Sequence, residues 1–154
     1  MLDTPRITTT IAQTAAVVHL TIPRDQIQRA MGPAIGEVMA ALGVQGIAPA
    51  GPLFSHHRRM DPAIFDFEIG VSVSAAVQPV GRVVPATLPA ATVARTIYRG
   101  PYEGLGQAWG EFQQWVRDHG HTAAPNLWEC YAVGPESSDD SSTWQTELSQ
   151  PLLR

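Results

Sequence analysis

The feature that most constrains the fold is an internal repeat. Residues 31–57 and residues 105–131 carry the same pattern of side chains at an offset of 74 positions, without a gap. Identity between the two copies is low, but every core-facing position of the helix is apolar or aromatic in both copies. The matched pairs are Met31 and Leu105, Ile35 and Trp109, Val38 and Phe112, Leu42 and Val116, Gly46 and Gly120, Leu53 and Leu127, Phe54 and Trp128, and His57 and Tyr131. The chain is therefore predicted to be built from two similar halves.

The second copy reads as strand, turn, helix, loop and strand. Residues 93–98 are β-branched and aromatic, and Gly100-Pro101 ends this strand because proline has no donor for a ladder. Large apolar residues then recur at steps of 4, 3 and 4, which stacks them on one face of a helix that ends at Gly120. Residues 127–133 predict the next strand. The helical stripe consists of Leu105, Trp109, Phe112 and Val116.

The first copy follows the same order. Residues 7–22 predict one long or two short strands, and a helix should run to about Leu42. Gly32-Pro33 interrupts that helix, so we expect it to start at Pro33. Further strands are predicted at 53–59 and 64–73, and residues 144–148 supply the matching strand of the second copy. The order β-α-β-β, given twice, indicates an α+β fold.

Two segments connect these elements. Residues 78–89 are rich in proline and are expected to cross from one copy to the other. Residues 134–143, with their serine and aspartate run, predict a mobile hairpin loop.

Glu129 is the most informative single residue. In a strand of period two, it shares one face with Leu127, Tyr131 and Val133. Most such carboxylates are exposed or paired with an arginine. The alternative is that the carboxylate lies inside a pocket. The residues alone leave both readings open.

Composition narrows the class of protein. The 154 residues are 44% hydrophobic and 16% charged, which is typical of one globular domain. No apolar run suits a membrane span or a secretory signal, so we expect a cytoplasmic protein that does not contact a membrane. A net charge of −4 without any lysine argues against direct nucleic-acid binding. The single cysteine, Cys130, excludes an internal disulfide and a cysteine-rich metal site.

The chain resembles the gyrase-inhibitory-protein-like (GyrI-like) domains, which are related to the effector-binding domains of bacterial transcription activators. The resemblance covers about the whole chain. Besides the duplicated order, it rests on the strand end Tyr-Arg-Gly-Pro-Tyr at 98–102, the helix with Trp109 and Trp115, the FDFEIGV strand, the signature Pro125, Glu129 and Tyr131, and the closing Glu147 and Pro151-Leu152.

The resemblance implies a fold and a kind of ligand. It implies a single domain over 1–154, with repeats at about 7–77 and 86–153 that form one curved antiparallel sheet with two helices. A pocket is expected at the pseudo-twofold axis, and it should bind lipophilic, often cationic, small molecules for sensing or sequestration. Because the chain starts close to the first strand, we expect a stand-alone member without a DNA-binding domain.

The resemblance also implies which residues bind. Glu129 is the expected polar group of the pocket, and Tyr131 and Trp109, followed by Phe67 and Tyr102, are the expected aromatic walls. Aromatic faces attract a cation by roughly 0.5–2 kcal/mol each. The simpler interpretation of each aromatic residue is packing in the core.

Two other functions remain open. Some family members hydrolyse strained, cyclopropane-bearing electrophiles, and Glu129 would then be the acid-base group. Others bind a protein partner such as DNA gyrase, for which no residue can be named. No cofactor is expected, and no metal site is predicted, since His56 and His57 point to opposite faces of a strand.

Overall fold

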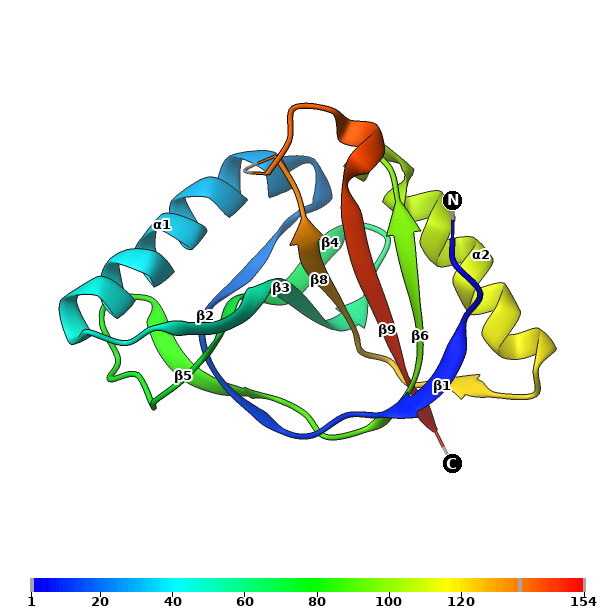
Figure 1. Cartoon of the computed structure of the whole chain (residues 1–154), viewed down its shortest axis with the longest axis horizontal. Helices are drawn as coiled ribbons and strands as arrows, with labels where there is room; N and C mark the ends of the chain where they lie inside the picture. The colour runs from blue at the N-terminus through cyan, green and yellow to red at the C-terminus, as the bar shows by residue number, and fades with distance from the viewer. Residues whose placement is uncertain (1, 136, 154) are drawn as a thin grey trace. The chain divides into compact units, whose positions relative to one another are not determined.

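The computed structural model describes residues 2–135 and 137–153, without the side chain of Met60. The chain divides into two compact units of similar construction (Figure 1). We call Ile11–Ala90 the α1 unit, and Met1–Thr10 together with Ala91–Arg154 the α2 unit.

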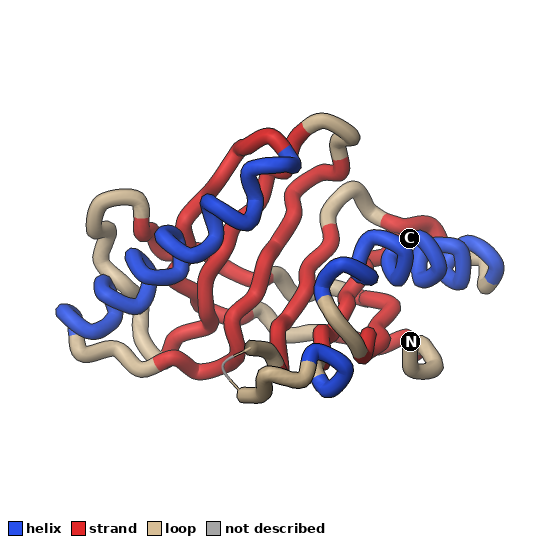
Figure 2. The backbone as a smooth tube through the Cα atoms, turned by 90° about the horizontal axis from the view of Figure 1, so that it is seen from above, coloured by secondary structure: helices blue, strands red, loops and turns tan. Residues whose placement is uncertain are grey.

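The α1 unit is an antiparallel sheet with one long helix. Its strands are hydrogen-bonded in the order β3-β4-β2-β5. Helix α1 packs on strands β2 and β4 of this sheet (Figure 2). The elements are β2 (Gln13–Pro23), the short 3₁₀ helix η1 (Arg24–Gln26), α1 (Ile27–Gln45), β3 (Pro49–Met60), β4 (Ile64–Val73) and β5 (Val83–Leu88).

The α2 unit repeats this construction. Its strands are antiparallel in the order β1-β6-β9-β8, and a short strand, β7, pairs with β9. The elements are β1 (Arg6–Thr9), β6 (Thr92–Arg99), η2 (Tyr102–Gly104), α2 (Leu105–Asp118), β7 (Thr122–Ala123), β8 (Leu127–Val133), η3 (Ser141–Thr143) and β9 (Gln145–Leu153).

The predicted α+β class, the antiparallel pairing and the two main helices are confirmed. Both units show the duplicated order, as β2-α1-β3-β4 and as β6-α2-β8-β9. Strands β4 and β8 have the predicted bounds, 64–73 and 127–133. Residues 7–22 form two strands, and the first of them, β1, pairs with β6 of the α2 unit.

One detail of the prediction was wrong and another was incomplete. Helix α1 begins at Ile27 and continues through Pro33, although we expected it to start there. Pro33 is exposed, so the carbonyl of Arg29 that loses its intrahelical bond can be hydrated, and the buried stripe of the helix offsets a cost of about 3 kcal/mol. The segment 78–89 also contains a strand, β5, because an edge strand tolerates Pro85.

The two helices end in the same way. Gly46 and Gly120 both have the left-handed backbone conformation that favours glycine, with φ of 67° and 78°. The next residue donates its N–H five residues back in each case, from Ile47 to Leu42 and from His121 to Val116, at 3.0 Å. The predicted helix end at Gly120 is confirmed, and the cap recurs at the repeat offset.

Candidate functional site

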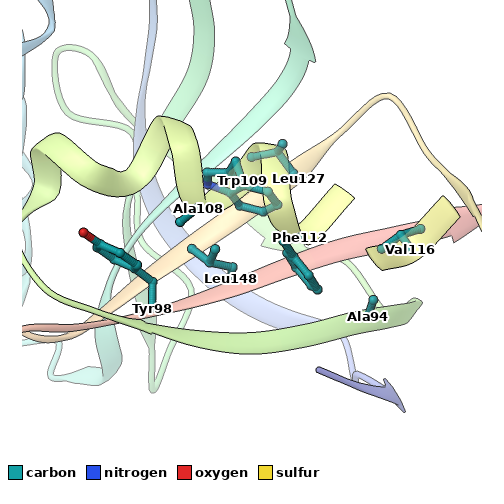
Figure 3. Packing of buried hydrophobic residues seen from close by; sticks show 8 residues of the cluster. All are labelled: Ala94, Tyr98, Ala108, Trp109, Phe112, Val116, Leu127 and Leu148. Carbon is teal, nitrogen blue, oxygen red and sulfur yellow. The ribbon is translucent and has the colours of Figure 1, made fainter. Parts of the chain in front are cut away.

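The candidate site lies on the face of the α2 unit's sheet that packs against α2. Leu148, at the centre of β9, packs in one apolar cluster with Trp109 and Phe112 of α2 (Figure 3). Residues directly opposite in an antiparallel ladder share a face. Glu129 is opposite Leu148, and Thr146 is opposite both Tyr98 and Tyr131. All of these side chains therefore belong to the face that α2 covers.

Glu129 is buried on this face without a hydrogen-bond partner for one oxygen. Glu129 is 8% exposed, and its Oε2 has no hydrogen-bond partner among the described residues. Burial raises the pKa of Glu129 to about 7, since the charged carboxylate loses its hydration. The indole of Trp109 acts in the opposite direction and lowers this pKa. The indole N–H thus faces the carboxyl group, but Nε1 and Oε2 are outside hydrogen-bonding geometry.

Two further buried polar atoms, one on α2 and one on the sheet beneath it, lack a hydrogen bond within the described part of the chain. They are Nε1 of Trp109, a residue that is 8% exposed, and Oγ1 of Thr146, which is fully buried. Buried polar groups in folded proteins are almost always hydrogen-bonded, and leaving one unpaired costs about 1–3 kcal/mol. With Oε2 of Glu129, they make three such groups where α2 packs on the sheet, and these groups define the candidate site.

A row of aromatic rings continues from Glu129 along this face. The ring of Tyr131, two residues along β8, lies 5.7 Å from that of Tyr102 in an edge-to-face arrangement. The Tyr102 ring lies 4.9 Å from that of Trp144, whose indole Nε1 donates to the carbonyl of Ser138 at 2.9 Å. These three residues are half-buried. The site thus combines a desolvated carboxyl group with half-buried aromatic side chains.

The structure brings together four of the five residues that the sequence suggested. Glu129, Tyr131, Trp109 and Tyr102 all belong to the α2 unit, and Trp109 also packs on Phe112, with ring centroids 5.7 Å apart. Phe67 belongs to the α1 unit, where it is fully buried and stacks on His57 at 4.9 Å. A role of Phe67 in ligand contact stays a prediction.

Sequence reasoning missed Thr146 and Trp144. Thr146 carried no signal, because a threonine in a strand is ordinary and only its lack of a partner distinguishes it. Trp144 stands directly before the closing strand, two positions from Thr146. Residues two apart in a strand share a face, so extending the strand back from Thr146 by two residues would have placed Trp144 on the same face.

A second buried carboxyl group, that of Glu68 in the α1 unit, has partners. Glu68 receives a hydrogen bond from Arg58 at 2.9 Å, and His56 Nδ1 lies 3.7 Å from its other oxygen. His56 and Arg58 hold the pKa of Glu68 below its ordinary value. Glu68 is therefore a charged, compensated group, whereas Glu129 has no cationic partner among the described residues.

Other chemistry finds little support in the described residues. Among the described residues, no group of three His, Cys, Asp or Glu side chains could hold a metal ion. Burial raises the pKa of Cys130 to about 12, so its thiol is unreactive at neutral pH. None of the described helices is long and apolar enough to cross a membrane.

Comparison with known proteins identifies relatives of the same fold. No curated protein matches the chain at a significant level. The crystal structure of the EcmrR C-terminal domain superposes with a TM-score of 0.86 at 21% identity, over 98% of both chains. In the EcmrR–DNA complex the TM-score is again 0.86, at 22% identity over 98% of this chain, which spans 57% of the EcmrR chain.

Two more distant structures share this fold. SAV2435 bound to tetraphenylphosphonium gives a TM-score of 0.66 at 12% identity, over 98% of this chain and 94% of that one. A hydrolase encoded by lin2189 from Listeria innocua gives 0.60 at 13% identity, over 97% and 91%. At these identities the likeness establishes the fold alone.

The family itself is identified by sequence. The family described as "GyrI-like small molecule binding domain" matches residues 3–153, nearly the whole chain. This confirms the resemblance drawn from the repeat and from the motifs around Glu129. The protein therefore belongs to the GyrI-like small-molecule-binding domains.

Proposed function

We propose that the face beneath α2 binds lipophilic cations, with Glu129 as the counter-charge and the rings of Tyr131, Tyr102 and Trp109 as contacts. The observation that carries this proposal is the buried Oε2 of Glu129, which has no partner among the described residues. An ionised carboxylate without a partner is unfavourable in an apolar environment. A bound cation would supply the missing charge.

The aromatic row supports a cation with apolar bulk. Ring faces attract cations by about 0.5–2 kcal/mol each when water is excluded. Tyr102 contacts both Tyr131 and Trp144, so the rings form a continuous surface that starts two residues from the carboxyl group. An ion that is both charged and aromatic would match the two parts of the site.

The relatives agree with this chemistry. Tetraphenylphosphonium, the compound bound to SAV2435, is a lipophilic cation without hydrogen-bond donors. EcmrR binds DNA in its complex and is longer than this chain. For this chain we propose sensing or sequestration of such compounds.

Calorimetric titration at pH about 8, where Glu129 is ionised, tests the proposal. We expect tetraphenylphosphonium to bind, and neutral triphenylphosphine oxide to bind far more weakly. Glu129→Gln should weaken binding of the cation by about thirtyfold or more, because it removes one partner of a buried charge pair. Glu111→Gln makes the same change of charge on the exposed face of α2 and should have no effect. Equal affinities of the parent and Glu129→Gln would refute the assignment.

A second candidate function is hydrolysis. A carboxyl group with a pKa of about 7 is suited to exchange a proton at neutral pH, and the relative encoded by lin2189 is described as a hydrolase. Mass spectrometry of the titrated samples separates the two functions. A strained, cyclopropane-bearing electrophile consumed by the parent, but not by Glu129→Gln, would make the protein an enzyme. Unchanged ligand supports binding alone.

A further inference from the structure

The position of Thr146 gives the site a second hydrogen-bond acceptor close to Glu129. Glu129 is opposite Leu148 in the β8–β9 ladder, and Tyr131 is opposite Thr146. Glu129 and Thr146 are therefore diagonal neighbours on one face, a relation in which Cα atoms lie roughly 7–8 Å apart. Both side chains are buried, and Oε2 and Oγ1 each lack a partner within the described residues.

The third unpaired atom has the opposite chemistry. The indole N–H of Trp109 can only donate a hydrogen bond, so it can pair with the Glu129 carboxylate but not with an ammonium group. Its effect on the pKa of Glu129 favours the charged form. The oxygens of Glu129 and Thr146 are then the acceptors left for a ligand.

Resting on the function proposed above, we infer that the site selects cations that carry at least two N–H donors, such as primary and secondary aryl-alkyl ammonium ions. One N–H would donate to Oε2 of Glu129 and another to Oγ1 of Thr146, while the aryl group lies against Tyr131. A quaternary ammonium ion has no N–H. It would neutralise Glu129 but gain no hydrogen bond to the Thr146 hydroxyl, so it should bind less tightly than an ion that donates to both oxygens.

Three probes with the same aryl group test this inference. Benzylammonium has three N–H donors, benzyldimethylammonium has one and benzyltrimethylammonium has none. We expect the parent to bind benzylammonium about tenfold more tightly than benzyltrimethylammonium at pH about 8, as for a hydrogen bond to a charged group. Thr146→Val should remove most of the advantage of benzylammonium over benzyldimethylammonium and leave the affinity for benzyltrimethylammonium unchanged.

Two variants control for structural effects. Thr146→Ser keeps the hydroxyl group and should keep the preference. Thr96→Val makes the same substitution on the same face, but Thr96 Oγ1 already donates to the carbonyl of Asp3 at 2.7 Å. Thr96→Val should therefore lower stability without changing the preference among the probes.

The outcomes separate this inference from the proposed function. If the parent binds all three probes equally, or if Thr146→Val weakens all three equally, the inference is wrong while Glu129 remains the counter-charge. If no cation binds the parent, the proposed function itself fails, and this inference fails with it.

Discussion

The two units share one order of elements but differ in the residues at equivalent positions of β3 and β8. At the repeat offset, Ser55 and His57 of the α1 unit correspond to Glu129 and Tyr131 of the α2 unit. His57 is 5% exposed, and its Nδ1 has no partner among the described residues. The α1 unit thus buries a base, His57, on β3, and the α2 unit buries an acid, Glu129, on the equivalent strand β8.

Burial moves these two groups in opposite directions. Loss of hydration, with His56 and Arg24 nearby, lowers the pKa of His57 to about 4. Loss of hydration raises the pKa of Glu129 to about 7. In both cases burial disfavours the charged form, so both groups are neutral between pH about 4 and about 7. One physical effect thus gives the two units opposite responses to pH.

The signs follow from proton linkage. For Glu129 the folded state binds a proton more tightly than the unfolded chain, so stability falls as pH rises from about 4.5 through about 7. For His57 the unfolded chain binds the proton more tightly, so stability falls as pH drops from 6.5 through about 4. Three predictions test the comparison between the units.

The largest expected effect compares the two helices. Phe112 in α2 and Val38 in α1 are repeat equivalents, and both are fully buried. Phe112→Ala should lower the free energy of unfolding by about 3–5 kcal/mol, because it leaves a large cavity in the apolar cluster. Val38→Ala removes fewer atoms and should cost about 2 kcal/mol. Chemical denaturation measures the free energy of unfolding of both variants. Equal losses would contradict a larger contribution of Phe112 than of Val38 to stability.

The second prediction concerns Glu129 in the absence of ligand. At pH 8 the parent holds an unpaired buried carboxylate, so Glu129→Gln should raise the free energy of unfolding by up to about 3 kcal/mol. At pH 5 the parent carboxyl group is protonated, and the difference should disappear. Denaturation curves at both pH values check this. A difference independent of pH would mean that Glu129 is not desolvated.

The third and smallest effect concerns His57. Between pH 6.5 and pH 5 the parent should lose about 1–2 kcal/mol through this residue, since only the unfolded chain takes up the proton. His57→Phe keeps a ring between Phe65 and Phe67, which lie 5.3 and 4.9 Å away, and should not show this loss. The change in the free energy of unfolding between these two pH values is measured for the parent and for the variant. The difference between the two changes isolates the contribution of His57. An identical pH dependence in both proteins would show that His57 is hydrated.

The fold could be predicted well because its signals are local and repeated. The apolar stripes of both helices, the strand bounds at 64–73 and 127–133 and the helix end at Gly120 all follow from spacing and turn chemistry. The failures are also physical. The sequence predicts a helix start at Pro33, but packing of the stripe that includes Ala34 and Val38 overrides the local preference of this proline.

The site could be predicted only in part. Period two placed Glu129 among apolar neighbours, and the resemblance selected the pocket reading over the exposed one. What the sequence could not supply is the state of hydrogen bonding, which depends on residues far apart in the chain. The unpaired hydroxyl of Thr146 and the contact of Trp144 with Tyr102 both depend on how β9 lies beside β8 and η2.

The desolvated carboxyl group of Glu129 has one more consequence. Because burial raises the pKa of Glu129 to about 7, molecules that hold a proton at the position where the proposed cation would pair are present near neutral pH. Filling the site would then exchange one ion for another, and the released proton would appear as heat of buffer ionisation. Under the proposed function, occupancy of the site would therefore depend on the ratio of ligand to hydrogen ion and not on the ligand concentration alone.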